Sequence, residues 1–180
     1  DLFYSTLSPA QAALMMYGIA PPTPKETVRL LDEIFVKKEK LLEKKYVDIL
    51  ERIRQCFKDI EHGKIKEVTG NEVESLIQDA KKYLDRIKKL FAVIQKRKDQ
   101  QSVVEAYDNC ENLLKDALIS AGVKASSSEN GLKVLIKARE IPESTLKMFK
   151  QIKNSRKNSK KLEKHEVDKI RKEARSFSKS

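Results

Sequence analysis

The stretch Lys58–Lys64 combines side chains that can move a proton with side chains that can hold a phosphate. It places His62 beside carboxylates and lysines, at the point where a helical pattern ends. An imidazole titrates near neutral pH and can act as a general acid or base, while an arginine upstream can grip a phosphate with its planar fork. Arg54 and His62 are therefore the candidate catalytic residues of a metal-independent ribonuclease.

A structural role explains the same residues. A histidine in the last turn of a helix interacts favourably with the helix dipole, and Gly63 can adopt the left-handed conformation that ends a helix. On a helix, Arg54 and His62 would differ by about 80° in direction and lie about 12 Å apart along the axis. We therefore expect anion binding more than catalysis here. The expected phosphate ligands are Arg52, Lys58 and Lys64.

A second basic cluster lies near the other end of the chain. Residues 147–180 carry 13 basic and 4 acidic side chains, in a chain whose net charge is +11. A segment this basic favours polyanions such as RNA, DNA or nucleotide phosphates, and a solvated helix face is an equally weighted alternative. The cluster holds no general base before His165, so binding is again favoured over catalysis. The candidate phosphate ligands are Arg156, Lys157, Asn158, Lys160 and Lys161.

Several classes of function lack their sequence signature. There is no glycine-rich phosphate loop, no zinc-ligand spacing and no serine-hydrolase motif, so neither a cofactor nor a metal is predicted. Cys56 and Cys110 are isolated thiols, which is typical of a protein in a reducing cytosol. The apolar run from Ala10 to Ala20 is too short to span a bilayer. We therefore expect a cytoplasmic protein without a membrane partner.

The elements that would position these residues follow helical periodicity, and the sequence shows no convincing strand alternation. Helix start signals recur at Ser8–Gln11, Thr23–Glu26 and Thr69–Glu72, each with Ser or Thr three residues before Glu or Gln. Gly18 and Gly122 are expected helix ends. The sequence therefore predicts an all-α protein of antiparallel, up-and-down helical bundles.

The most regular apolar stripe runs from Val73 to Ile94 and predicts a helix of about six turns. The polar stretch Lys96–Gln101 after it is expected to be a linker or a bridge into a second unit. The segment from Asn71 resembles the segment from His165 at a fixed offset of 94 residues, which predicts two related units, 1–98 and 102–180. The stripe comprises Val73, Leu76, Ile77, Ala80, Tyr83, Leu84, Ile87, Leu90, Phe91 and Ile94.

Segments with a recognisable pattern cover most of the chain in two stretches: Ala10–Met15 with Gly18, Pro21–Lys25, Arg54 with His62-Gly63, Thr69–Leu84, Glu105–Gly122 and Arg156–Arg175. In these segments the chain resembles the HEPN group, also called the nucleotidyltransferase substrate-binding superfamily. The resemblance implies two HEPN-like bundles of four or five helices, the first without its opening helix if the chain is a fragment that begins at Asp1.

Members of this family act as ribonucleases with an Arg-x4–6-His motif or as substrate-binding partners of nucleotidyltransferases. Seven residues separate Arg54 from His62, and eight separate Arg156 from His165, so both spacings exceed the motif. The resemblance therefore favours a non-catalytic or weakly catalytic module that binds nucleotide or RNA and serves a nucleotidyltransferase domain in the same or a separate chain. The alternatives are a ribonuclease that uses His62, and an interaction scaffold or homodimer formed through the Val73–Ile94 stripe.

Overall fold

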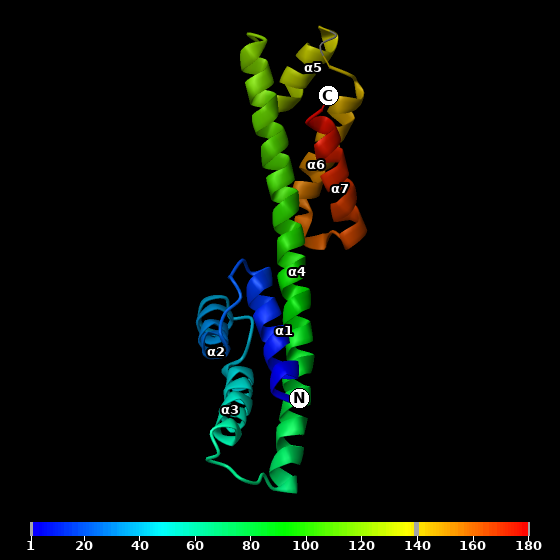
Figure 1. Ribbon diagram of the computed structural model, residues 1–180. Coiled ribbons are helices and arrows are strands. Elements are labelled where there is room, and N and C mark those ends of the chain that lie inside the picture. The colour runs from blue at the N-terminus through cyan, green and yellow to red at the C-terminus, as the bar shows by residue number, and fades with distance from the viewer. Residues whose placement is uncertain (1, 139–140, 180) are drawn as a thin grey trace. The chain divides into compact units, whose positions relative to one another are not determined.

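The computed structural model describes residues 2–138 and 141–179, and in these ranges it consists of helices and connections, without strands (Figure 1). The predicted all-α fold is thereby confirmed. Asp1 and Ser180, the outer ends of the two predicted units, lie outside the described residues. The elements are α1 (Leu2–Met16), α2 (Pro24–Leu30), the π-helix η1 (Leu31–Lys38), α3 (Lys44–Glu61), α4 (Gly70–Ser120), α5 (Ser128–Lys137), α6 (Ser144–Lys157), the 3-10 helix η2 (Ser159–Lys161) and α7 (Lys164–Phe177).

The contacts divide the chain into two compact units, Asp1–Gln95 and Lys96–Ser180. The border falls within α4, so each unit contains one part of this helix. The first unit combines α1, α2 with η1, α3 and the first part of α4. The second unit combines the rest of α4 with α5, α6 and α7. The borders at 1–98 and 102–180, and the HEPN-like character of the units, stay predictions.

The core of the first unit forms where α1, η1, α3 and α4 turn their apolar faces toward one another. Leu14, Phe35, Leu50 and Tyr83 supply one fully buried side chain from each of these four elements. Most of the stability of helices in proteins comes from the packing of an apolar face, so this shared core stabilises α1 and α3, and α2 with its seven residues depends on it most.

Two of the three predicted helix starts are confirmed. The Thr23 hydroxyl accepts a hydrogen bond from the Glu26 N–H at 3.4 Å, and the Glu26 carboxylate accepts one from the Thr23 N–H at 2.9 Å. Thr69 and Glu72 make the same exchange at 3.4 and 3.0 Å, and the bond from the Thr69 side chain is the main cause that lowers the pKa of the Glu72 carboxyl. Each box satisfies two backbone donors that a helix start leaves unpaired.

The first predicted helix start is wrong. α1 begins at Leu2 and continues through Pro9, instead of starting at Ser8. Proline in a helix interior removes one backbone hydrogen bond, so burial of the turns before it must offset that cost. Phe3 is buried in this segment and stacks on Phe57 of α3, with ring centroids 4.5 Å apart. Packing between the helices therefore overrides the local start signal.

Of the two expectations for Lys96–Gln101, the linker is wrong, because α4 runs unbroken from Gly70 to Ser120, and the bridge into a second unit agrees with the unit border at Gln95. The stretch is polar, but it consists largely of Lys, Arg and Gln, which are good helix formers. Of the stripe that precedes it, Val73 and Ile77 are exposed. Leu76, Ala80, Tyr83, Ile87, Leu90 and Ile94 are buried in the first unit's own core, so they do not form a free face for a partner helix.

The core of the second unit lies between the last part of α4 and the three helices that follow it. Tyr107, Leu132, Phe149 and Ile170 are buried there, one from each helix. Gly122 has φ +66° directly after α4, which confirms the predicted helix end. α6 starts at Ser144, two residues after Pro142.

The 94-residue offset relates two helix starts that have the same structure. Glu163 stands 94 residues after Thr69, and Glu166 stands 94 residues after Glu72. Both pairs form a capping box, the first at the start of α4 and the second at the start of α7. The aligned Tyr83 and Phe177 are buried in the cores of the first and second units. The offset thus relates helices that have the same local structure and both contribute to a core.

Candidate functional site

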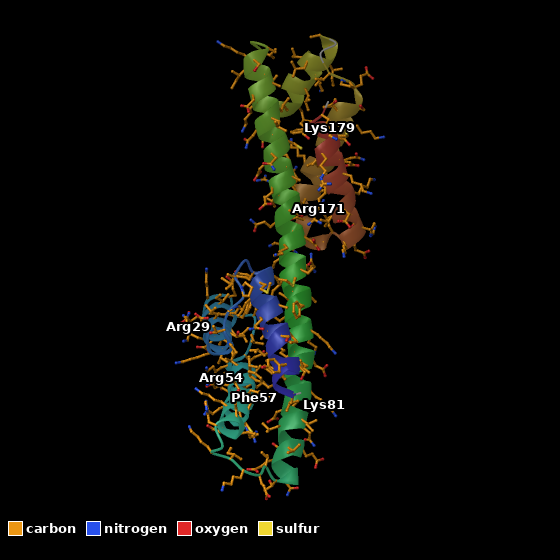
Figure 2. All side chains as sticks on the ribbon, in the orientation of Figure 1. Arg29, Arg54, Phe57, Lys81, Arg171 and Lys179 are labelled. Atoms are coloured by element: carbon orange, nitrogen blue, oxygen red, sulfur yellow. The ribbon has the colours of Figure 1, made fainter. Side chains whose placement is uncertain are left out.

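Arg54 lies on α3, where its guanidinium is engaged by a neighbouring carboxylate. Its Nε and Nη2 donate to the two carboxylate oxygens of Glu51, both at 2.7 Å, and its side chain is only 13% exposed. This bidentate pair is the main cause that raises the pKa of Arg54 and lowers the pKa of the Glu51 carboxyl. Arg54 and Glu51 line a cleft of about 540 Å³ together with Lys25 and Arg29 of α2; Figure 2 labels both arginines.

His62 occupies the end of α3. It is the C-terminal cap, its N–H donates to the Lys58 carbonyl at 3.0 Å, and its side chain is exposed. Gly63 follows with φ +68°, the left-handed conformation expected of a helix terminator. α3 stays helical up to Glu61, so the helix end does not unwind toward Arg54. The structure therefore does not bring His62 and Arg54 together.

Arg52 points to a different partner from Arg54. Its Nη1 donates to Asp79 of α4 at 3.1 Å, so it links α3 to α4 within the first unit. Residues two positions apart on a helix point in directions that differ by about 200°, which explains why Arg52 and Arg54 face different neighbours. Arg52 therefore contributes to packing between helices rather than to a common cationic site with Arg54.

The lysines near His62 stand among carboxylates. Lys64 lies 3.5 Å from Asp59, and the pKa of Asp59 is lowered mainly by a hydrogen bond from Gln55, with Lys64 as a further cause. Lys58 is exposed. The segment 58–74 carries three lysines and five carboxylates, so its local charge does not favour a polyanion.

The second predicted cluster lies where α6, η2 and α7 follow one another. Arg156 lies over the ring of Tyr107, 4.7 Å from its centroid, and 3.6 Å from Asp108. The Asn158 side chain donates to the Asn154 carbonyl at 3.2 Å, at the end of α6. Both residues therefore have structural partners, and Arg156 connects α6 to α4 within the second unit.

Lys157, Lys160 and Lys161 differ from these two residues because they are exposed and form no ion pair within the described ranges. Lys164, at the start of α7, is also exposed and without an ion pair to a described residue. It is not among the residues expected from the sequence, although it lies only three positions after Lys161. His165 is exposed and its Nδ1 lies 3.5 Å from Glu163, so it is a surface residue and the capping residue is Glu163. We call the four lysines 157, 160, 161 and 164 the lysine cluster.

Within 2–138 and 141–179, no group of three or more His, Cys, Asp or Glu side chains could hold a metal ion. Among the described helices, none has the combination of length and apolar character that a membrane span requires.

Comparisons with models of known protein families, with curated proteins and with solved structures give no match. The resemblance to the HEPN group and the functions it implies therefore stay predictions.

Proposed function

We propose that this chain is a helical module that binds the phosphates of RNA or nucleotides, with the lysine cluster as its main contact. The observation that supports the proposal is the presence of four exposed lysines without ion pairs at the junction of α6, η2 and α7. A lysine without a carboxylate partner has no adjacent negative charge to offset its field, and each phosphate that such lysines contact releases counterions into solution.

The surrounding charge favours this location over the end of α3. Residues 147–180 have a net charge of +9, whereas 58–74 carries more carboxylates than lysines. A positive field extends about 8–10 Å at physiological salt, so neighbouring lysines act together on an approaching polyanion. Arg52, Lys58 and Lys64 are therefore expected to contribute less to binding than Lys157, Lys160 and Lys161.

The partner would be a nucleotidyltransferase domain, in the same chain or in a separate one, for which this module holds the substrate. This part of the proposal rests on the resemblance to the HEPN group. A ribonuclease has less support, because Arg54 is paired with Glu51 and is separated from His62 by an intact helical segment.

Binding can be measured by fluorescence anisotropy with a short, labelled single-stranded RNA. We expect affinity to fall as salt rises from about 50 to 200 mM, with a slope of about −0.7 per phosphate contacted. The double variant Lys160→Glu and Lys161→Glu should weaken binding by about tenfold or more, because it replaces two attractive charges with two repulsive ones.

The matched control reverses two other exposed lysines, Lys81→Glu and Lys89→Glu of α4, and so changes the net charge by the same amount. If both double variants lose affinity equally, the lysine cluster has no special role. Binding that does not respond to salt, or no binding at low salt, would remove the proposed function.

A further inference from the structure

A groove of about 620 Å³ runs between α4 and α7 in the second unit. Its floor consists of small side chains, Ala106 and Cys110 from α4 and Ala174 from α7, which leave space between the two helices. Cys110 is buried and Leu113 is 46% exposed, so Cys110 belongs to the apolar floor and Leu113 adds an apolar side chain to the wall. Its volume falls within the range of small-molecule sites in proteins.

One end of the groove is fixed by Arg171, which Figure 2 labels on α7. Its Nη2 donates to Asp99 at 3.2 Å and its Nε donates to the Ser102 hydroxyl at 3.1 Å, both on α4. Its Nη1 donates to Asp168 at 3.1 Å. The charge of Arg171 is therefore already compensated, and its role is to hold α4 and α7 at this spacing.

The walls beyond Arg171 carry polar groups without partners. Asn109 and Asn112 line the α4 wall three residues apart, and Arg175 lines the α7 wall one turn after Arg171. All three are exposed, and their side chains form no hydrogen bond or ion pair with another described residue, whereas the Arg175 carbonyl accepts a hydrogen bond from the Ser178 hydroxyl at 2.9 Å. Two amides and one guanidinium thus border the same groove with their hydrogen-bonding capacity unused.

Two carboxylates limit which kinds of ligand the groove can bind. Glu105 and Asp116 also line the α4 wall, so a small bare anion would meet repulsion as well as the attraction of Arg175. A ligand that offers hydroxyl or amino donors to the carboxylates and a single anionic group to Arg175 avoids this repulsion. The lining along α4 extends from Ser102 to Asp116, about 21 Å along the helix axis, which is longer than a bare phosphate requires.

We infer that the α4–α7 groove binds one nucleoside phosphate, with its base on the Asn109 and Asn112 side and its phosphate on Arg175. Asparagine amides offer a donor and an acceptor together, as the edge of a base requires, and adenine is the base that they match best. The ribose hydroxyls can donate to Glu105 or Asp116, and the apolar floor can pack against the face of the base. This inference rests on the proposed function and names the ligand that the groove would recognise, a single nucleotide.

The test measures binding of AMP, GMP, CMP and UMP to the full chain by calorimetry, with ribose 5-phosphate and inorganic phosphate as partial ligands. We expect AMP to bind most tightly and inorganic phosphate to show no detectable binding. Arg175→Gln should weaken AMP binding by about tenfold or more, because it removes a charge-assisted hydrogen bond. Lys172→Gln removes a neighbouring exposed charge of α7 that does not line the groove, and should leave the affinity unchanged.

A second variant separates the base from the phosphate. Asn109→Ala should weaken AMP binding about fivefold to tenfold and leave ribose 5-phosphate binding unchanged, because only the base contact is lost. The amide is exposed and alanine is a good helix former, so the variant should fold. Equal losses for AMP and ribose 5-phosphate would overturn the assigned orientation.

A free nucleotide and the terminal nucleotide of an RNA offer the same chemistry to the groove. Competition distinguishes them: a short RNA with a terminal phosphate should displace AMP if the RNA end is the natural occupant, whereas the same RNA without that phosphate should not. Displacement by neither RNA indicates a free nucleotide.

The inference is overturned if AMP shows no binding at about 1 mM, or if Arg175→Gln and Asn109→Ala both leave its affinity unchanged. RNA binding that still depends on Lys160 and Lys161 would then leave the proposed function standing. Loss of both AMP binding and salt-dependent RNA binding would remove both proposals.

Discussion

At the scale of single residues, Tyr83 joins α4 to α1. Its side chain is fully buried, and its hydroxyl donates a hydrogen bond to the Thr6 carbonyl at 3.1 Å. Burial raises the pKa of the Tyr83 hydroxyl, so the group stays protonated as a donor throughout the physiological range. The bond is made close to Pro9, where α1 has one backbone hydrogen bond fewer than a regular helix.

The variant Tyr83→Phe should therefore lower the free energy of unfolding by about 1 kcal/mol, since it removes one buried hydrogen bond and keeps the ring. Chemical denaturation with urea measures this change. Tyr46→Phe is the matched control, because the Tyr46 hydroxyl forms no hydrogen bond with another described residue. Equal stability of the two variants would contradict a stabilising role for the Tyr83 bond.

At the scale of elements, α4 is the helix whose extent the sequence pattern underestimates. Residues 96–101 lack an apolar stripe, so the sequence leaves open a linker or a bridge into a second unit. One side of this stretch is nevertheless fixed by a contact from the distant helix α7, because Asp99 accepts a hydrogen bond from Arg171. A polar segment can therefore stay helical where its backbone bonds continue and a distant side chain anchors it.

Lys98 tests this continuity, because it is exposed and lies inside the stretch. Lys98→Pro should lower the free energy of unfolding by about 3 kcal/mol or more, while Lys98→Ala should change it little. Circular dichroism during thermal unfolding measures both variants. A proline variant as stable as the alanine variant would show that residues 96–101 are a flexible linker after all.

At the scale of the whole molecule, the described residues form separate cores in the two units. The buried clusters of the first unit contain residues up to Ile94, and the cluster of the second unit begins at Val103. Among the described residues, each buried cluster therefore belongs to one unit. We therefore expect the two cores to respond separately to mutation.

Phe149→Ala should remove about 3–5 kcal/mol of stability from the second unit, because it opens a cavity at a fully buried site. Hydrogen exchange followed by mass spectrometry should show faster exchange in α5, α6 and α7, with α1 and α3 unchanged. Phe35→Ala, at an equally buried site of the first unit, should produce the reverse pattern. Faster exchange in both units for either variant would show that they unfold as one.

Many residues of the candidate site can be named from the sequence, but the sequence does not show which of their charges are paired with a neighbour. The basic residues near 156–161 and the histidine at the end of α3 stand where their sequence pattern places them. The sequence does not reveal that Arg156 lies over the Tyr107 ring and pairs with Asp108, nor that Arg52 pairs with Asp79. These partners belong to other helices, so only packing determines which cations remain free.

Capping boxes, glycine terminators and apolar periodicity act between residues that are only a few positions apart, so the helical class and several helix ends follow from the sequence. Packing between helices is needed to explain why α1 passes through Pro9, why α4 continues through 96–101, and why a groove lies between α4 and α7. The contact between Arg171 and Asp99 that holds this groove joins positions 72 residues apart. Such contacts form only when the helices pack, and no local pattern in the chain specifies them.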